Sequence, residues 1–394
     1  MKRRTTLKLI LGSSIFGSAL VSALSEKQVM AMGALSVNNQ ARAAASYAAM
    51  QKYFYKQDGS HLYLEQYPAQ SGDNTYSYEW PFSQAHIATL DLTSIPVAGH
   101  SYIADLTDRS LGQEHYWNTT GATGVAGYDS YPRPPYGNGG DKFYDDNEWV
   151  GLAKLQNYLA TGDKAALQRA KDIFKLVISG WDTDASHPAP GGVFWTQAPW
   201  SHDRNTVSNM PGAEMGLRLY LITHESSYLD WAHKMYDWTN ANLLAPNGLY
   251  WDHIDLAGTI EKTQWSYNQG VPVGVNTLFY KVTGDPAYLH KAESIASAAL
   301  AFYATNNALY AQPAPFNSIF FKNLLLLQSV NHNPSYLQAM QAYGDKVWTS
   351  YRDAATGLFH LDASKPTTQL LEQAAMTQIY AVLSWTPDRY GILY

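Results

Sequence analysis

Apolar residues recur at helical spacing along most of the chain, and a short polar turn repeats between the apolar segments. Thr161-Gly162-Asp163 and Thr283-Gly284-Asp285 each separate two such segments, and weaker versions of the turn begin at Thr223 and Asn333. Glycine can end one helix and Asp or Thr can cap the next one. The repeat therefore predicts pairs of helices joined by tight turns.

The pattern predicts about twelve helices that close into a ring. Paired helices are expected at residues 147–160 with 164–179, 210–222 with 226–243, 268–282 with 286–305, and 317–330 with 335–350. Single helices are expected at residues 41–55, 82–93, 101–115 and 368–384. An open solenoid is the alternative, but its repeats are usually shorter and more alike. We predict an all-α fold, an (α/α)6 toroid whose long aromatic inter-pair segments gather at one face as the active-site cleft.

The N-terminal residues have a different pattern. Lys2-Arg3-Arg4 precedes an apolar stretch from Leu7 to Leu24 whose only charge is Lys8, which is typical of an export signal. The two arginines resemble a twin-arginine signal, and a general secretory signal or a short membrane anchor are the alternatives. We predict a signal peptide over residues 1–31 and one domain over residues 32–394, because no linker divides the remainder.

Composition and charge restrict the partners. The 394 residues are 46% hydrophobic and include no cysteine, so an exported chain would depend on core packing, and a bacterial source is favoured. Residues 1–31 hold five cationic side chains and one carboxylate, so their removal would take the formal charge from -6 to -10. Such a chain would repel nucleic acid and acidic polysaccharides. We expect a monomer that acts on a neutral polymer, with no membrane partner after cleavage, and the many Tyr and Trp rings suit stacking on sugars.

Two adjacent carboxylates stand where a loop changes into a helix. Asp145 and Asp146 lie between Tyr144 and the pair Asn147 and Trp149, and repulsion between them favours one ionised and one protonated group. Glycoside hydrolysis uses such a pair, and a separation of roughly 5 to 6 Å would suit the retaining mechanism. A helix N-terminus stabilises anions, so burial and repulsion must raise the pKa of the acid. Simple helix capping is the alternative interpretation.

Other chemistries have weaker support. The 12 histidines lack the helical spacing of two metal ligands, and the sequence has no HExxH, GxSxG, P-loop or dinucleotide motif. We therefore predict no metal and no cofactor.

The carboxylate segment also carries a family resemblance. Tyr144-Asp145-Asp146-Asn147-Glu148-Trp149 followed by Gly151-Leu152-Ala153 resembles the signature of glycoside hydrolase family 76, the endo-α-1,6-mannanases. Further segments agree in order and spacing, namely Gly191 to Trp195, Asn209, Gly248 to Asp252, Tyr267 to Gly270, and Phe321-Lys322. The resemblance spans roughly residues 41–385.

The resemblance implies a retaining hydrolase of α-1,6-linked mannan, with Asp145 as nucleophile and Asp146 as acid/base. Together with the flanking residues, it suggests the following substrate contacts: Tyr144, Asn147, Trp149, Trp195, Asn209, Asp252, Tyr267, Asn268 and Gln269. Two features depart from the family pattern, Asn323 where glycine is common and the aromatic-rich segment 76–92. We expect neither to touch the carboxylate pair.

Several other functions stay open on the sequence. A transglycosylase would use the same covalent intermediate, with a sugar hydroxyl in place of water. A polysaccharide lyase or an unsaturated-uronide hydrolase would need groups that neutralise a uronate, and the acidic chain has no basic cluster for that role. A non-catalytic glycan-binding protein of the same fold would bind mannan without forming product.

Overall fold

The computed structural model describes residues 26–394, so the predicted apolar export segment lies outside the described residues. Residues 36–394 form one compact unit, and the described residues before Ser36 do not belong to it. Among the described residues, none of the helices is long and apolar enough to cross a membrane.

Twelve α-helices dominate the described residues. Those that form the inner ring are α2 (Glu79–Thr93), α4 (Tyr144–Thr161), α6 (Thr206–Thr223), α8 (Tyr267–Thr283), α10 (Ala314–Asn331) and α12 (Leu370–Val382). The others are α1 (Glu26–Tyr53), α3 (Ile103–Glu114), α5 (Lys164–Ser179), α7 (Ser226–Asn242), α9 (Pro286–Ala304) and α11 (Ser335–Ser350). Short 3-10 helices occur at η1 (Ala98–Tyr102), η2 (Thr305–Ala311) and η3 (Pro387–Ile392).

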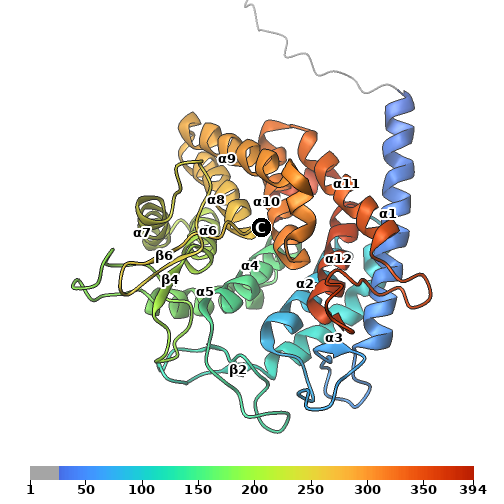
Figure 1. Cartoon of the computed structure of the whole chain (residues 1–394), viewed down its shortest axis with the longest axis horizontal. Helices are drawn as coiled ribbons and strands as arrows, with labels where there is room; N and C mark the ends of the chain where they lie inside the picture. Colours follow the sequence, from blue (N-terminus) through green and yellow to red (C-terminus); the bar gives the residue numbers. More distant parts are fainter. Residues whose placement is uncertain (1–25) are drawn as a thin grey trace, which may run out of the picture. The chain divides into compact units, whose positions relative to one another are not determined.

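The inner helices close into a ring. Each packs against the next in the order α2, α4, α6, α8, α10 and α12, and α12 packs back against α2 (Figure 1). Helices α3, α5, α7, α9 and α11 each pack on the inner helix that precedes them in the chain. The predicted (α/α)6 toroid is confirmed.

Burial explains the two rings. The inner helices are buried on nearly all sides, as in the run from Tyr267 to Phe279 of α8, because neighbours and an outer helix surround them. An outer helix such as α5 buries one stripe only, which includes Ala170, Ile173 and Val177. The ring axis is filled by side chains, and η3 packs there against α4 and α10.

The tight turns have the predicted caps. Gly162 and Gly284 end α4 and α8 with φ of 78° and 72°, a left-handed conformation that glycine adopts without strain. Asp163 and Asp285 then accept hydrogen bonds from Ala165 N–H and Ala287 N–H at 2.9 Å. The other two turns place His224 and His332 in the left-handed position.

Four of the inner helices begin well before their predicted first residues, whereas α12 begins two residues after its own. Helices α2, α4, α6 and α10 start three or four residues before their expected first residues, because their N-caps carry no side-chain capping bond that the sequence could reveal. Side-chain amides further along hold these helix starts instead. Asn209, for example, accepts from Val193 N–H at 2.9 Å and donates to the carbonyl oxygens of Val193 and Asn205.

Small antiparallel sheets lie in the segments that lead into the inner helices. Strand β1 (Gln66–Tyr67) pairs with β7 (Thr368–Gln369), and β2 (Trp117–Asn118) pairs with β3 (Gly127–Tyr128). A third sheet has the order β4 (Asp203–Asn205), β5 (His253–Asp255) and β6 (Ile260–Glu261). These sheets lie at the ring face where the inner helices begin, opposite the tight turns.

Candidate active site

A cavity of about 330 Å³ opens at the N-terminal ends of the inner helices. Five inner helices contribute residues near their starts to its wall, and strands β4 and β5 and the segments that precede them contribute the rest. The lining residues are Trp80, Asp145, Asp146, Trp149, Trp195, Asp203, Asn205, Val207, Asp252, His253, Tyr267 and Phe316. The long inter-helix segments therefore gather at one face, as predicted.

Asp145 and Asp146 lie in the first turn of α4. Asp145 is 8% exposed, and its Oδ2 accepts a hydrogen bond from Trp195 Nε1 at 3.1 Å while Oδ1 has no protein partner. The main chain sets this contact, because Tyr144 N–H donates to the carbonyl oxygen of Trp195 at 2.9 Å. One carboxylate is thus fixed by an indole, and its neighbour Asp146 is half-buried beside it.

The two carboxyl groups differ in acidity. Burial raises the pKa of Asp145 to about 7, against the hydrogen bond from Trp195 and the main-chain N–H groups of the helix start, which favour the anion. Burial, followed by the charges of Asp145 and Glu79, raises the pKa of Asp146 well above its usual value. These environments favour ionisation of Asp145 before Asp146, which is the order that a retaining glycosidase needs when the first aspartate is its nucleophile.

Aromatic rings form the sides of the cavity. Tyr267 and Phe316 stack with ring centroids 3.8 Å apart and planes at 3°, and Trp80 stacks on the same Phe316 at 6.0 Å. Trp195 packs edge-on against Phe143 at 4.9 Å. Flat apolar faces beside hydrogen-bonding groups suit pyranose rings, which present apolar C–H faces and polar edges.

Strands β4 and β5 supply polar groups to the cavity. Asn205 pairs in register with His253, so both reach the cavity with Asp203 and Asp252. His253 Nδ1 lies 2.9 Å from Asp252 Oδ2, and this contact raises the pKa of His253. Asn268 Nδ2 donates to Asp252 Oδ1 at 3.0 Å, so Asn268 fixes Asp252.

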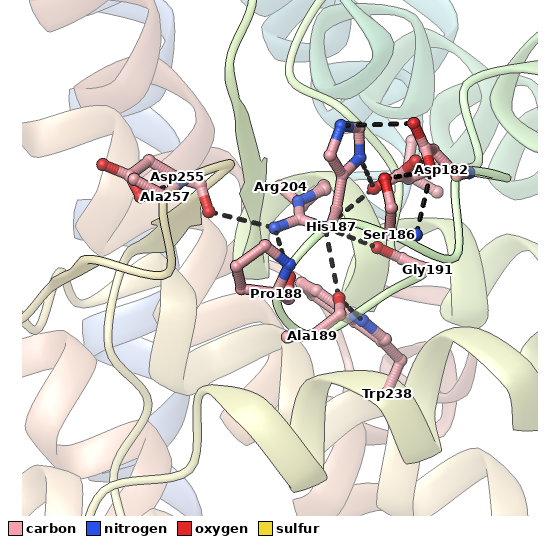
Figure 2. A network of polar contacts seen from close by, with 12 residues as sticks. Asp182, Ser186, His187, Pro188, Ala189, Gly191, Arg204, Trp238, Asp255 and Ala257 are labelled. Carbon is pink, nitrogen blue, oxygen red and sulfur yellow. Dashed lines mark hydrogen bonds and ion pairs between the residues drawn. The ribbon is translucent and has the colours of Figure 1, made fainter.

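A buried arginine holds β4 in place. Arg204 is fully buried, and its Nη1 lies 2.8 Å from Asp182 Oδ2 (Figure 2). Its two Nη atoms also donate to the main-chain carbonyl oxygens of four residues, Pro188, Ala189, Gly191 and Asp255. This network ties the segment 182–191 to β4 and β5, and so positions Asp203 and Asn205 on either side of Arg204.

The structure brings six of the predicted site residues into the cavity wall, namely Asp145, Asp146, Trp149, Trp195, Asp252 and Tyr267. Tyr144 instead packs against Gly180, and Asn268 acts on Asp252. The amides of Asn147, Asn209 and Gln269 each bond the N–H and carbonyl oxygen of one residue in the preceding segment, which is Tyr128, Val193 or Tyr250. In these positions the three amides hold the main chain beneath the cavity by hydrogen bonds.

The sequence interpretation also missed part of the site. Asp203, Asn205 and His253 reach the cavity through strand pairing between distant segments, which leaves no local signal. The segment 76–92 was expected not to touch the carboxylate pair, but its start belongs to the same site. Trp80 lines the same cavity, and the charges of Glu79 and Asp145 act on one another. Three aromatic or acidic residues in a row at a helix start, Tyr78, Glu79 and Trp80, were the available signal.

Comparisons with known proteins place the chain in a family. The sequence profile of Glycosyl hydrolase family 76 matches residues 37–369. A mannan endo-1,6-alpha-mannosidase of Candida glabrata is 30% identical over 147 residues, which is 35% of this chain and 32% of that protein. A second such enzyme, from Saccharomyces cerevisiae, is 29% identical over 40% of this chain and 38% of its own length. This chain thus spans about a third of the length of these curated relatives.

Solved structures agree with the profile. A family 76 glycoside hydrolase from a bovine strain of Bacteroides thetaiotaomicron has a TM-score of 0.76 and 26% identity, and the match covers 88% of this chain and 77% of that one. A family 76 mannosidase from the same species has a TM-score of 0.75 and 25% identity, with 88% and 98% covered. The resemblance of the carboxylate segment is confirmed, and the chain belongs to glycosyl hydrolase family 76.

Proposed function

We propose that this protein is a retaining glycoside hydrolase that cleaves α-1,6-mannosidic linkages inside neutral mannan. The single observation that carries the proposal is the arrangement at the start of α4. There Asp145 accepts the Trp195 indole N–H, and Asp146 is held protonated by burial and by the charge of its neighbour. Family membership and relatives named for mannan endo-1,6-α-mannosidase activity support the choice of substrate.

The proposed reaction has two steps. In the first, the ionised Asp145 attacks the anomeric carbon while Asp146 gives its proton to the departing glycosidic oxygen, so a mannosyl ester forms on Asp145. In the second step, Asp146 takes a proton from water, and the resulting hydroxide displaces Asp145 from the sugar. Two displacements at one carbon return the α configuration. If a sugar hydroxyl replaces water, the same site gives transglycosylation.

The cavity chemistry supports a neutral polymer. Asp145, Asp146, Asp203 and Asp252 line the cavity, and no lysine or arginine does so in the part of the chain that the structure describes. A uronate would be repelled, whereas sugar hydroxyls can donate to these carboxylates. The proposal includes export through the N-terminal segment and action as a monomer.

The test is product analysis by NMR during incubation of the protein with linear α-1,6-mannan. We expect α-anomeric oligosaccharides as the first products and their loss in Asp145→Ala and Asp146→Ala. Asp230→Ala, at an exposed aspartate on α7, is the matched control and should keep parental activity. First products of β configuration, or activity in both cavity variants, would contradict the proposed mechanism.

The same experiment separates the alternatives. Products longer than the added acceptor in the presence of short manno-oligosaccharides would indicate a transglycosylase. Mannan binding that survives both substitutions, with no product from the parent, would indicate a glycan-binding protein. Turnover of uronate polymers without turnover of mannan would indicate the lyase or uronide hydrolase alternative.

A further inference from the structure

A third carboxyl group, Glu79, lies close to the Asp145–Asp146 pair. Glu79 begins α2, and the next residue, Trp80, lines the catalytic cavity. Helix α2 packs directly on α4, and the charge of Glu79 acts on Asp146 as well as on Asp145. The Glu79 side chain is 0% exposed and is not among the cavity-lining residues, so it is buried next to the cavity wall.

Glu79 is held in place by neutral groups. Its Oε1 accepts from Gln113 Nε2 of α3 at 2.7 Å, and its main-chain N–H donates to the carbonyl oxygen of Ser130 at 2.9 Å. Its Oε2 has no hydrogen-bond partner in the protein. Gln113 is fixed in turn, because its Oε1 lies 3.2 Å from His86 Nδ1 on α2. A buried carboxylate with one neutral donor and a free second oxygen is poorly stabilised as an anion.

The ionisable groups around Glu79 favour its neutral form. Asp145 and Asp146 face it from α4, Tyr116 from the end of α3, and Tyr128 from β3. From α2 itself comes His86, whose burial lowers its pKa to about 3 and keeps the ring uncharged. Glu79 takes part in none of the ion pairs of the described residues. The cations of this region, Lys154 and Arg109, act on His86 and lower its pKa further.

We propose that Glu79 is a positioning residue that holds a proton beside the Asp145–Asp146 pair and sets the upper pH limit of catalysis. This inference rests on the proposed function of the pair. While Glu79 is protonated, it adds no negative charge, and the pair can hold one charge and one proton as the reaction needs. Burial, with the charge of Asp145 behind it, raises the pKa of Glu79 to about 8. Above that pH a second anion forms next to the ionised Asp145. The three carboxyl groups then compete for one remaining proton, and whatever share Asp145 or Glu79 takes is lost to Asp146.

The substitution that tests this idea is Glu79→Gln. A glutamine keeps the oxygen that accepts from Gln113 and stays neutral at every pH. The matched control is Glu148→Gln, one helical turn beyond Asp145 on α4. Its carboxyl is also fully buried, and burial followed by the charge of Asp145 raises its pKa well above the usual value, so it shares both features with Glu79 but belongs to the pair's own helix. Both variants replace one buried carboxyl by an amide of the same shape, so both test for damage to the fold.

The first measurement is infrared difference spectroscopy from about pH 6 to about pH 9, a range that spans the ionisation of Glu79. In the parent, the C=O bands of two protonated carboxyls, those of Asp145 and Glu79, should disappear as the pH rises. Glu79→Gln should lose one of these two changes, and Glu148→Gln should keep both. This result needs no substrate, so it stands even if mannan proves not to be the substrate. A titration that is unchanged in Glu79→Gln would overturn the inference.

The second measurement is the pH profile of kcat/KM on α-1,6-mannan. Glu79→Gln should move the alkaline limb up by roughly one pH unit, with kcat at the optimum within about threefold of the parent. Glu148→Gln should leave the limb unchanged. Coincident limbs for the parent and Glu79→Gln, or equal shifts in the two variants, would overturn the role of Glu79 while the assignment of Asp145 and Asp146 stands.

Discussion

At the scale of single residues, environment distinguishes two adjacent aspartates that the sequence cannot tell apart. Asp145 has an indole N–H donor at 3.1 Å and the helix N–H groups, whereas Asp146 faces two other acids. Sequence reasoning found the pair and the need for a raised pKa. It could not find Trp195 as the donor from spacing alone, because the two residues are 50 positions apart and the chain forms α4 and α5 before it returns to the helix start.

Trp195→Phe tests this distinction. The substitution removes a hydrogen bond to a charged group, worth about 1.5–3 kcal/mol, and so raises the pKa of Asp145 by roughly one unit. Asp145 must be ionised for the first step, so activity falls as the pH drops through the pKa of Asp145. The higher pKa in the variant should therefore move the acidic limb of kcat/KM to higher pH. Trp200→Phe, at the exposed ring beside Trp195, is the control and should keep the parental limb. An unshifted limb in Trp195→Phe would show that the indole does not stabilise the anion.

At the scale of elements, the paired helices were predictable because each tight turn carries its own glycine and capping aspartate. The starts of the inner helices were not, because their stabilising partners are far away in the chain. Asn147, Asn209 and Gln269 bond a residue 16 to 19 positions earlier. Such amides look like sugar-binding groups in a sequence, since binding and main-chain bracing use the same donors and acceptors.

Asn209→Ala separates these two roles. As a brace, Asn209 satisfies the buried N–H and carbonyl groups of Val193, so its loss should lower the free energy of unfolding by about 1–3 kcal/mol. Asn242→Ala, which removes one side-chain bond to the carbonyl of Trp238, should have a smaller effect. Urea denaturation measures both. A fully stable Asn209→Ala with a raised KM would instead indicate a sugar contact.

The Arg204 network gives a second prediction for an element. Arg204→Met leaves the buried Asp182 without its cation, which typically costs about 3–5 kcal/mol. Activity should fall too, because β4 carries Asp203 and Asn205 into the cavity. Lys175→Met removes an exposed ion pair with Asp172 and should change stability by less than about 1 kcal/mol. Equal midpoints of chemical denaturation for the two variants would contradict this role for Arg204.

At the scale of the whole molecule, the closed ring brings the starts of distant helices to one cavity. Trp80 and Phe316 stack although 236 positions separate them, and no sequence pattern within either segment predicts the contact. The fold class was predictable because it depends on a repeat. The contributions of α2, α10, β4 and β5 to the cavity were not predictable, because they depend on ring closure and on the pairing of β4 with β5.

Buried acids also affect the stability of the whole molecule. Glu79 has a usual pKa of 4.5 and a native pKa of about 8, so the unfolded chain releases a proton that the native state keeps. Stability should therefore fall as the pH rises from about 5 to about 8, by up to about 4 kcal/mol from this group alone. Denaturation at the two pH values should show a clearly smaller fall in Glu79→Gln. An equal fall in both proteins would contradict the native pKa of Glu79.

The most direct test of the central claim is azide rescue on an aryl α-1,6-mannobioside whose leaving group needs no proton. Asp146→Ala should still form the ester on Asp145, and azide should then give a mannosyl azide of retained α configuration, identified by NMR. Asp145→Ala cannot form the ester, so any azide it yields should have the β configuration. An α-azide from Asp145→Ala together with a β-azide from Asp146→Ala would contradict the assignment and exchange the roles of the two aspartates.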